Sequence, residues 1–91
     1  MTYELEFSSK ALKEFDKLSP DIAGQFLKKL EKVLENPRIP KNKLHGAPHK
    51  DLYKIKLRSS GFRLLYEVND SRVVVVVITV GRRATIYERL G

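Results

Sequence analysis

Cationic and apolar residues alternate in the segment Tyr53-Lys54-Ile55-Lys56-Leu57-Arg58. Successive side chains of an extended strand point to opposite faces, so this alternation places Lys54, Lys56 and Arg58 on one face and the apolar residues on the other. Like charges that share a strand face repel one another, and a bound anion relieves the repulsion. The segment therefore indicates either a phosphate-binding surface or a solvated sheet face whose lysines discourage edge-to-edge aggregation.

Further arginines are predicted to lie near this face. Arg63 falls on the polar side of the next predicted strand. Arg82 and Arg83 follow Gly81 at the end of a long apolar strand, where a turn can aim both side chains across the sheet. Because guanidinium groups present paired donors that match phosphate oxygens, these residues favour the phosphate-binding interpretation.

Other chemistry has weaker support in the sequence. His45 and His49 are four residues apart, but the glycine and proline between them argue against a helix that would bring both rings to one metal. The chain has no glycine-rich phosphate loop and no catalytic-triad spacing. We therefore predict neither a metal site nor a cofactor. Tyr87 suits stacking on a nucleic-acid base, and packing in the core explains it equally well.

Positive charge is concentrated in the second half of the chain. The 18 Lys and Arg against 11 Asp and Glu give a net charge of +7. Residues 1–40 contain equal numbers of both signs, so the whole excess lies in residues 41–91, which include Lys41, Lys43 and Lys50 of an irregular connection. This clustering suggests a polyanionic partner, although a small domain can also carry such a charge for solubility alone.

The N-terminal half predicts one strand and two helices. Alternation over residues 2–7 is typical of a half-buried strand. Apolar residues at three- and four-residue spacing then predict a helix that Ser8 or Ser9 caps and that ends near Ser19-Pro20. Ser19 is placed to cap a second helix with Pro20 in its first turn, and Asn36-Pro37 ends that helix.

The C-terminal half predicts three strands. Residues 53–58 and 62–68 form a hairpin around the turn Ser59-Ser60-Gly61. The β-branched run Val73 to Val80 fits a central strand that is buried on both faces and ends at Gly81. The resulting order predicts an α+β fold, in which two N-terminal helices pack on one face of a small, mostly antiparallel four-stranded sheet.

Length and composition limit the remaining possibilities. A chain of 91 residues predicts a single domain over residues 1–91. Its longest apolar run has eight residues, against the ~20 that a membrane helix needs, and its first residues do not resemble a signal peptide. We therefore expect a cytoplasmic protein with no membrane partner. The lack of cysteine excludes disulfides, thiol catalysis and cysteine-based zinc sites.

Several stretches resemble the RelE family, the toxins of bacterial and archaeal type II toxin–antitoxin pairs. The resemblance covers nearly the whole chain, and it is carried by Ala11-Leu12-Lys13-Glu14, Asn36-Pro37-Arg38-Ile39, Asn42-Lys43-Leu44, Tyr53 to Tyr66 and Ile78-Thr79-Val80-Gly81-Arg82-Arg83. It implies a ribosome-dependent, metal-independent endoribonuclease that cuts mRNA in the ribosomal A site. It also implies that the partners are the ribosome with its RNA, mRNA, and a RelB-like antitoxin that wraps around the toxin.

The resemblance further implies which residues are catalytic. They are the lysines Lys54 and Lys56, the phosphate-binding Arg63, a second arginine, Arg83, and the stacking Tyr87. Fewer residues separate Arg83 from Tyr87 than in the family pattern. Around this group, we expect the following residues to bind RNA or the ribosome: Lys41, Lys43, Lys50, Arg58 and Arg82.

These residue types suit RNA cleavage without a metal. The ribose 2′-hydroxyl can attack the adjacent phosphate if an enzyme supplies a base, charge stabilisation and an acid. Arg63 would stabilise the charged transition state, either Lys54 or Lys56 would act as the base, and Arg83 would assist the leaving 5′ oxygen.

Two other functions remain open at this stage. A ParE-like toxin of the same fold would bind and inhibit DNA gyrase without cleaving RNA, because a shared fold does not determine function. A noncatalytic RNA-binding domain would use the same basic face without strand scission. The joint presence of the five candidate catalytic residues favours the nuclease.

Overall fold

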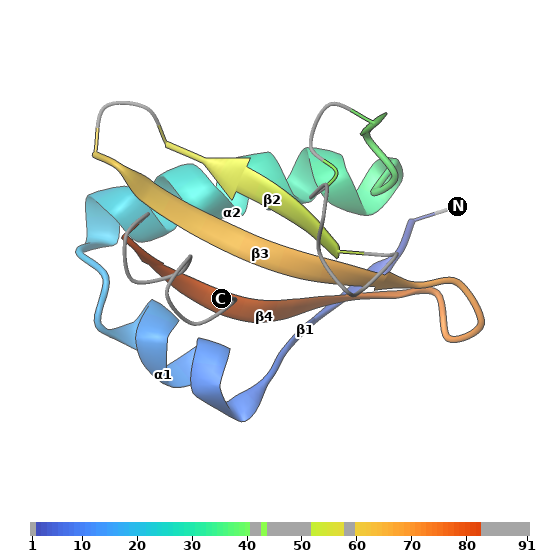
Figure 1. Ribbon diagram of the computed structural model, residues 1–91, viewed down its shortest axis with the longest axis horizontal. Helices are drawn as coiled ribbons and strands as arrows, with labels where there is room; N and C mark the ends of the chain where they lie inside the picture. The colour runs from blue at the N-terminus through green and yellow to red at the C-terminus, as the bar shows by residue number, and fades with distance from the viewer. Residues whose placement is uncertain (1, 41–42, 44–51, 58–59, 83–91) are drawn as a thin grey trace.

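A computed structural model describes residues 2–40, 43, 52–57 and 60–82 of the chain. The elements in chain order are β1 (Glu4–Phe7), α1 (Ser9–Asp16), α2 (Pro20–Glu35), β2 (Leu52–Lys56), β3 (Phe62–Asn69) and β4 (Val74–Arg82), as Figure 1 shows. This is the predicted order of one strand, two helices and three strands. Within the described residues, no helix is long and apolar enough to cross a membrane.

Both helices begin where the sequence predicts. The Ser8 side chain accepts a hydrogen bond from the backbone N–H of Ala11, and the Ser19 side chain accepts one from Ile22. Pro20 occupies the first turn of α2, where its missing N–H leaves no helical bond unmade. These caps fix the direction in which each helix leaves the preceding segment.

The four strands form one sheet in the order β1-β4-β3-β2. β2 pairs with β3 and β3 pairs with β4 in antiparallel fashion, whereas β1 pairs with β4 in parallel. The expectation of a mostly antiparallel sheet is therefore confirmed, with one parallel pair at the β1 edge. A β-bulge interrupts the β3–β4 register at Leu65 and Tyr66.

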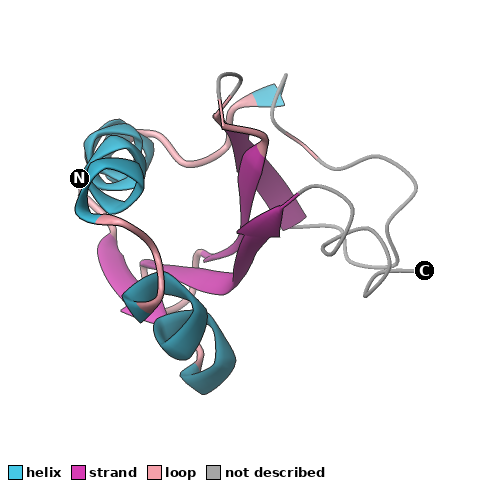
Figure 2. Ribbon diagram, turned by 90° about the vertical axis from the view of Figure 1, so that its left-hand side faces the viewer, coloured by secondary structure: helices cyan, strands magenta, loops and turns pink. Residues whose placement is uncertain are grey.

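The helices lie on one side of the sheet, as Figure 2 shows. Their buried residues pack against the side chains of the strands that alternate toward them. The main core cluster includes Phe26, Leu30 and Val33 of α2, Tyr53, Ile55 and Leu57 from β2 and the residue after it, Leu64, Tyr66 and Val68 of β3, and Val75, Val77 and Val80 of β4. Burial of these side chains leaves the alternate positions of β2 and β3 on the opposite face.

Strand boundaries differ from the sequence prediction by one or two residues at several ends, and the end of β4 is the one that affects the site. β4 does not end at Gly81 but continues through it to Arg82, because Gly81 pairs with Arg63 and Arg82 pairs with Phe62. The extra ladder pairs keep the chain extended. As a result, the turn that was expected to aim Arg82 across the sheet does not occur at Gly81.

Candidate active site

Three of the predicted cations lie together on the sheet face opposite the helices. Lys56 of β2 is the direct cross-strand neighbour of Arg63 in β3, and Lys54 is opposite Leu65. Lys54 and Lys56 share a strand face because they are two residues apart, and pairing with β3 brings Arg63 to the same face. We call Lys54, Lys56 and Arg63 the basic triad.

The three residues of the basic triad differ in their exposure to solvent. Lys56 is exposed, whereas Lys54 and Arg63 are half-buried. On its other side Arg63 is paired with Gly81, which has no side chain to cover the guanidinium. An anion at this position would meet a partly desolvated arginine, where a charge-assisted hydrogen bond is stronger than on an open surface.

A small apolar cluster continues the same face toward the β3–β4 turn. Leu52 and Leu65 are buried, and Ile78 packs against them. Glu67 is opposite Leu52 at that end of the hairpin. Along the described part of β2 and β3, the basic triad therefore adjoins this apolar cluster where Lys54 is opposite Leu65.

Arg82 lies on the other side of the sheet from Arg63. Its guanidinium carbon is 5.5 Å from the centre of the Phe62 ring, a cation–π distance. Phe62 packs against the main core, on the helix side. Both residues line a hollow of about 400 Å³ together with residues of α1, of α2 and of the segment between the helices. Arg82, which the sequence predicted to join the basic face, therefore lines a hollow on the helix side of the sheet.

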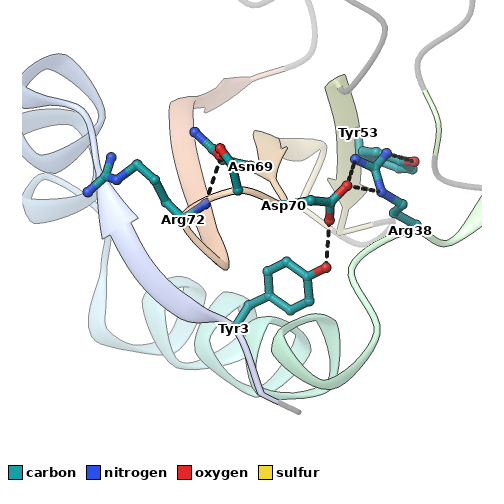
Figure 3. Close-up of polar contacts among 7 residues, drawn as sticks. Tyr3, Arg38, Tyr53, Asn69, Asp70 and Arg72 are labelled. Atoms are coloured by element: carbon teal, nitrogen blue, oxygen red, sulfur yellow. Dashed lines mark hydrogen bonds and ion pairs between the residues drawn. The ribbon is translucent and has the colours of Figure 1, made fainter.

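A polar network fixes the other end of the sheet (Figure 3). Arg38 donates to Asp70 through Nε at 3.1 Å and through a terminal nitrogen, and to the Tyr53 hydroxyl at 3.4 Å. The Tyr3 hydroxyl donates to the other Asp70 oxygen at 2.6 Å. The buried Tyr66 hydroxyl donates to the carbonyl of Pro37 at 2.9 Å. These bonds hold the segment after α2 against the strands.

Hydrogen bonding perturbs two groups of this network. The bond from Tyr3, and then that from Arg38, lowers the pKa of Asp70 below its ordinary value of 3.8, because both stabilise the carboxylate. The same bond to Asp70 raises the pKa of Tyr3 above 10.0, because it stabilises the neutral phenol. The sequence analysis did not identify this network, although Arg38 lies in one of the stretches that resemble RelE.

Comparison with known proteins agrees with the fold and identifies the family. The family model described as the ParE toxin of the type II toxin–antitoxin system parDE matches residues 5–87. The mRNA interferase toxin RelE of Escherichia coli strain K12 is 58% identical over 83 residues, which are 91% of this chain and 85% of that protein. The chain belongs to the RelE family of the RelE/ParE superfamily.

Solved structures of this family have the same fold. A double mutant of E. coli RelE in the free state superposes with a TM-score of 0.87 at 53% identity, covering 99% of this chain and 94% of that one. The RelE of the intact E. coli RelBE toxin–antitoxin complex gives 0.83 at 57% identity, covering 88% and 95%. The predicted α+β fold is therefore confirmed by the structure of this chain and by the solved structures of its relatives.

Several predicted residues of this RelE-family chain lie outside the described residues. They are Lys41, Lys50, Arg58, Arg83 and Tyr87. Lys43 is described: it is exposed and forms an isolated antiparallel bridge with Tyr53 of β2. No group of three His, Asp or Glu residues that could hold a metal ion occurs in the described ranges.

Proposed function

We propose that this chain is the toxin of a type II toxin–antitoxin pair and acts as an mRNA interferase, an endoribonuclease that cleaves mRNA in the A site of the ribosome. The name of the E. coli relative and the high identity over most of both chains support this proposal. The structural observation that carries it is the basic triad, in which Lys56 and Arg63 are direct cross-strand neighbours on the sheet face opposite the helices.

The proposed reaction needs only the substrate and side chains of the chain. A base removes the proton of the ribose 2′-hydroxyl, and the 2′ oxygen forms a bond to phosphorus. The bond from phosphorus to the 5′ oxygen then breaks, and that oxygen takes up a proton. The products are a 2′,3′-cyclic phosphate and a 5′-hydroxyl end, so no water and no metal ligand takes part.

The basic triad supplies the charge that this reaction requires. Arg63 holds the phosphate and stabilises the negative charge that develops on its oxygens. Lys54 or Lys56 accepts the 2′ proton, which requires the amine in its neutral form, and the other lysine adds electrostatic stabilisation. In the same proposal Arg83 assists the departing oxygen and Tyr87 stacks on a base to align the attack in line with the leaving group.

The proposal includes three partners. A RelB-like antitoxin neutralises the toxin, as the solved RelBE complexes suggest for their own chains. The ribosome and its mRNA are the substrate complex. Because the whole net charge of +7 arises in residues 41–91, the basic half is the surface that binds these polyanions and an acidic or amphipathic antitoxin segment.

Mapping mRNA 5′ ends after expression of the toxin alone tests the proposal. We expect new 5′-hydroxyl ends within translated regions as growth stops. Cells that express Arg63→Ala should show few such ends, whereas cells that express Arg72→Ala should resemble wild type, because Arg72 forms an exposed ion pair with Glu6 away from the basic triad.

The same experiment separates the alternatives. Growth arrest without new mRNA 5′ ends, together with loss of supercoiling by purified gyrase, would favour a ParE-like gyrase inhibitor. This result would overturn the nuclease hypothesis. Binding to ribosomes without scission would favour the noncatalytic RNA-binding domain. The basic triad favours the nuclease over both, because inhibition by binding needs no clustered cations around a single phosphate.

A further inference from the structure

The end of β4 beside the basic triad is held from the opposite edge by α1. β1 pairs with β4 only as far as Phe7 and Val77, whereas β4 continues to Arg82. In the described part of the chain, contacts from Ser8 and from α1 rather than from a further strand follow β1 along this edge. Ser8 donates from its backbone N–H to the Val77 carbonyl at 3.0 Å and from its hydroxyl to the Ile78 carbonyl at 3.1 Å.

Glu14 of α1 makes the next contacts along this edge. One of its carboxylate oxygens accepts a hydrogen bond from the Thr79 hydroxyl at 2.8 Å and another from the backbone N–H of Val80 at 3.2 Å. Thr79 is buried, with 5% of its surface exposed, and Glu14 is half-buried. The second bond takes the place of a ladder bond that a neighbouring strand would otherwise supply.

These contacts lie where the sheet is least regular. The β-bulge of the β3–β4 pair leaves Ile78 between Leu65–Thr79 and Tyr66–Val77. A bulge locally disrupts the ladder and changes the twist of the strand. Glu14 bonds to the two residues that follow this irregularity, so it restricts the position at which regular pairing resumes.

Regular pairing after the bulge determines where Arg63 lies. Val80 pairs with Leu64 and Gly81 pairs with Arg63, whose cross-strand neighbour on the other side is Lys56. Arg82 and Arg83 follow directly in the sequence. A shift of β4 at Val80 would therefore also shift its pairing with the part of β3 that carries Arg63.

We propose that Glu14 is a positioning residue for RNA cleavage. It touches no substrate, and it acts through Val80 by fixing the end of β4 against Arg63. This inference rests on the proposed nuclease function. Both contacts are accepted by one carboxylate oxygen from O–H and N–H donors, and a glutamine amide oxygen can accept the same two bonds.

Single-turnover cleavage on ribosomes carrying a defined mRNA, with toxin at saturation, tests the inference. Glu14→Ala should lower the rate about 10- to 100-fold while the toxin concentration at half-saturation changes little, because misplacement by about 1 Å can cost 10²-fold in rate. Glu14→Gln should recover most of the rate. Asp16→Ala, which removes an exposed carboxylate from the same helix, should cleave like wild type.

Two further variants separate positioning from loss of stability. Val33→Ala removes buried side-chain volume from α2 and should lower the unfolding temperature without lowering the saturated rate of the folded protein. Thr79→Val removes only the hydroxyl donor, and it should reduce the rate severalfold and add little in the Glu14→Ala background. If Glu14→Ala does not fold, Thr79→Val and Glu14→Gln decide the question.

The outcomes distinguish this inference from the proposed function. Absence of cleavage by wild type would overturn the nuclease itself. If wild type cleaves, a wild-type rate in Glu14→Ala or in Thr79→Val would overturn the positioning role. Failure of Glu14→Gln to recover the rate would also overturn it, because the charge and not the hydrogen bonds would then be required.

Discussion

At the scale of single residues, Arg63 is the side chain on which the proposed chemistry depends most. Arg63 is half-buried, and in the sheet it is the cross-strand partner of Lys56. We predict that Arg63→Ala lowers the saturated cleavage rate by about 10²- to 10³-fold, as expected for removal of one preorganised donor to a charged transition state.

Arg72→Ala is the matched control for this substitution. This substitution also removes an arginine, but one that lies in the β3–β4 turn, pairs with Glu6 at 3.0 Å and is well exposed to water. Single-turnover rates with saturating toxin keep lost binding from being mistaken for lost chemistry. Near-normal cleavage by Arg63→Ala would show that the active site is not on this sheet face.

The Asp70 carboxylate gives a prediction about pH and stability. Its pKa is lower in the folded protein than the ordinary value of 3.8, first through Tyr3 and then through Arg38. Between these two pKa values the unfolded chain binds more protons than the folded protein. The contribution of Asp70 to the free energy of unfolding is therefore present above pH 3.8 and is lost as the pH falls through the folded pKa. Asp70→Asn should lack this contribution.

Urea unfolding of wild type and Asp70→Asn between neutral and strongly acidic pH measures this difference. The difference in free energy of unfolding between the two proteins should be largest above pH 3.8 and should decrease as the pH falls through the folded pKa of Asp70. Tyr3 has the opposite effect at alkaline pH. Because its pKa is raised in the folded protein, the free energy of unfolding should fall as the pH rises above 10.0, and Tyr3→Phe should not show this fall. A constant gap at acid pH would contradict the assigned network.

At the scale of elements, Gly61 shapes the turn that joins the two strands of the basic triad. Its φ of +74° lies in the left-handed region, and no atom would contact an added Cβ. We predict that Gly61→Ala lowers the free energy of unfolding by about 1 kcal/mol through backbone strain alone.

Gly24 in α2 provides a control with the opposite sign. An added Cβ again meets nothing within 4 Å, but here the backbone is helical. Gly24→Ala should therefore raise the free energy of unfolding by roughly 0.5–1 kcal/mol. Denaturant titration of both variants checks the pair, and equal effects of the two substitutions would contradict the backbone explanation.

The elements also explain which features the sequence could predict. The helix starts follow from Ser8, Ser19 and Pro20, whose capping chemistry is local, and the basic triad follows from the period-two alternation of one hairpin. The predicted end of β4 at Gly81 was wrong. Glycine usually interrupts a strand, whereas here the pairing of Gly81 with Arg63 continues it. Arg82 consequently points toward Phe62 and not toward the triad.

Other features depend on residues that are far apart in the chain. Glu14 meets Thr79 across 65 positions and Tyr3 meets Asp70 across 67. No local spacing encodes such pairs, because their proximity follows from the sheet order β1-β4-β3-β2. The resemblance to RelE included the stretches that hold Glu14 and Arg38 but did not indicate what these two residues contact.

At the scale of the whole molecule, the unequal charge of the two halves predicts where the antitoxin binds. The excess of +7 lies in residues 41–91, and both helices of the described residues lie on one side of the sheet. Hydrogen exchange of the toxin with and without its antitoxin should show new protection within the basic half. Protection confined to residues 1–40 would contradict this expectation.

The parallel pairing of β1 with β4 also bears on when the toxin becomes active during its own synthesis. β1 leaves the ribosome well before its partner residues Val74–Val77, which are made about 70 positions later. The nascent chain therefore carries an unpaired N-terminal strand until β4 emerges, and contacts of such high sequence separation close slowly. On the proposed function, the ribosome that translates this chain is not exposed to a completed active site while β4 is still inside it, and a co-translationally bound antitoxin has that interval in which to reach the new toxin.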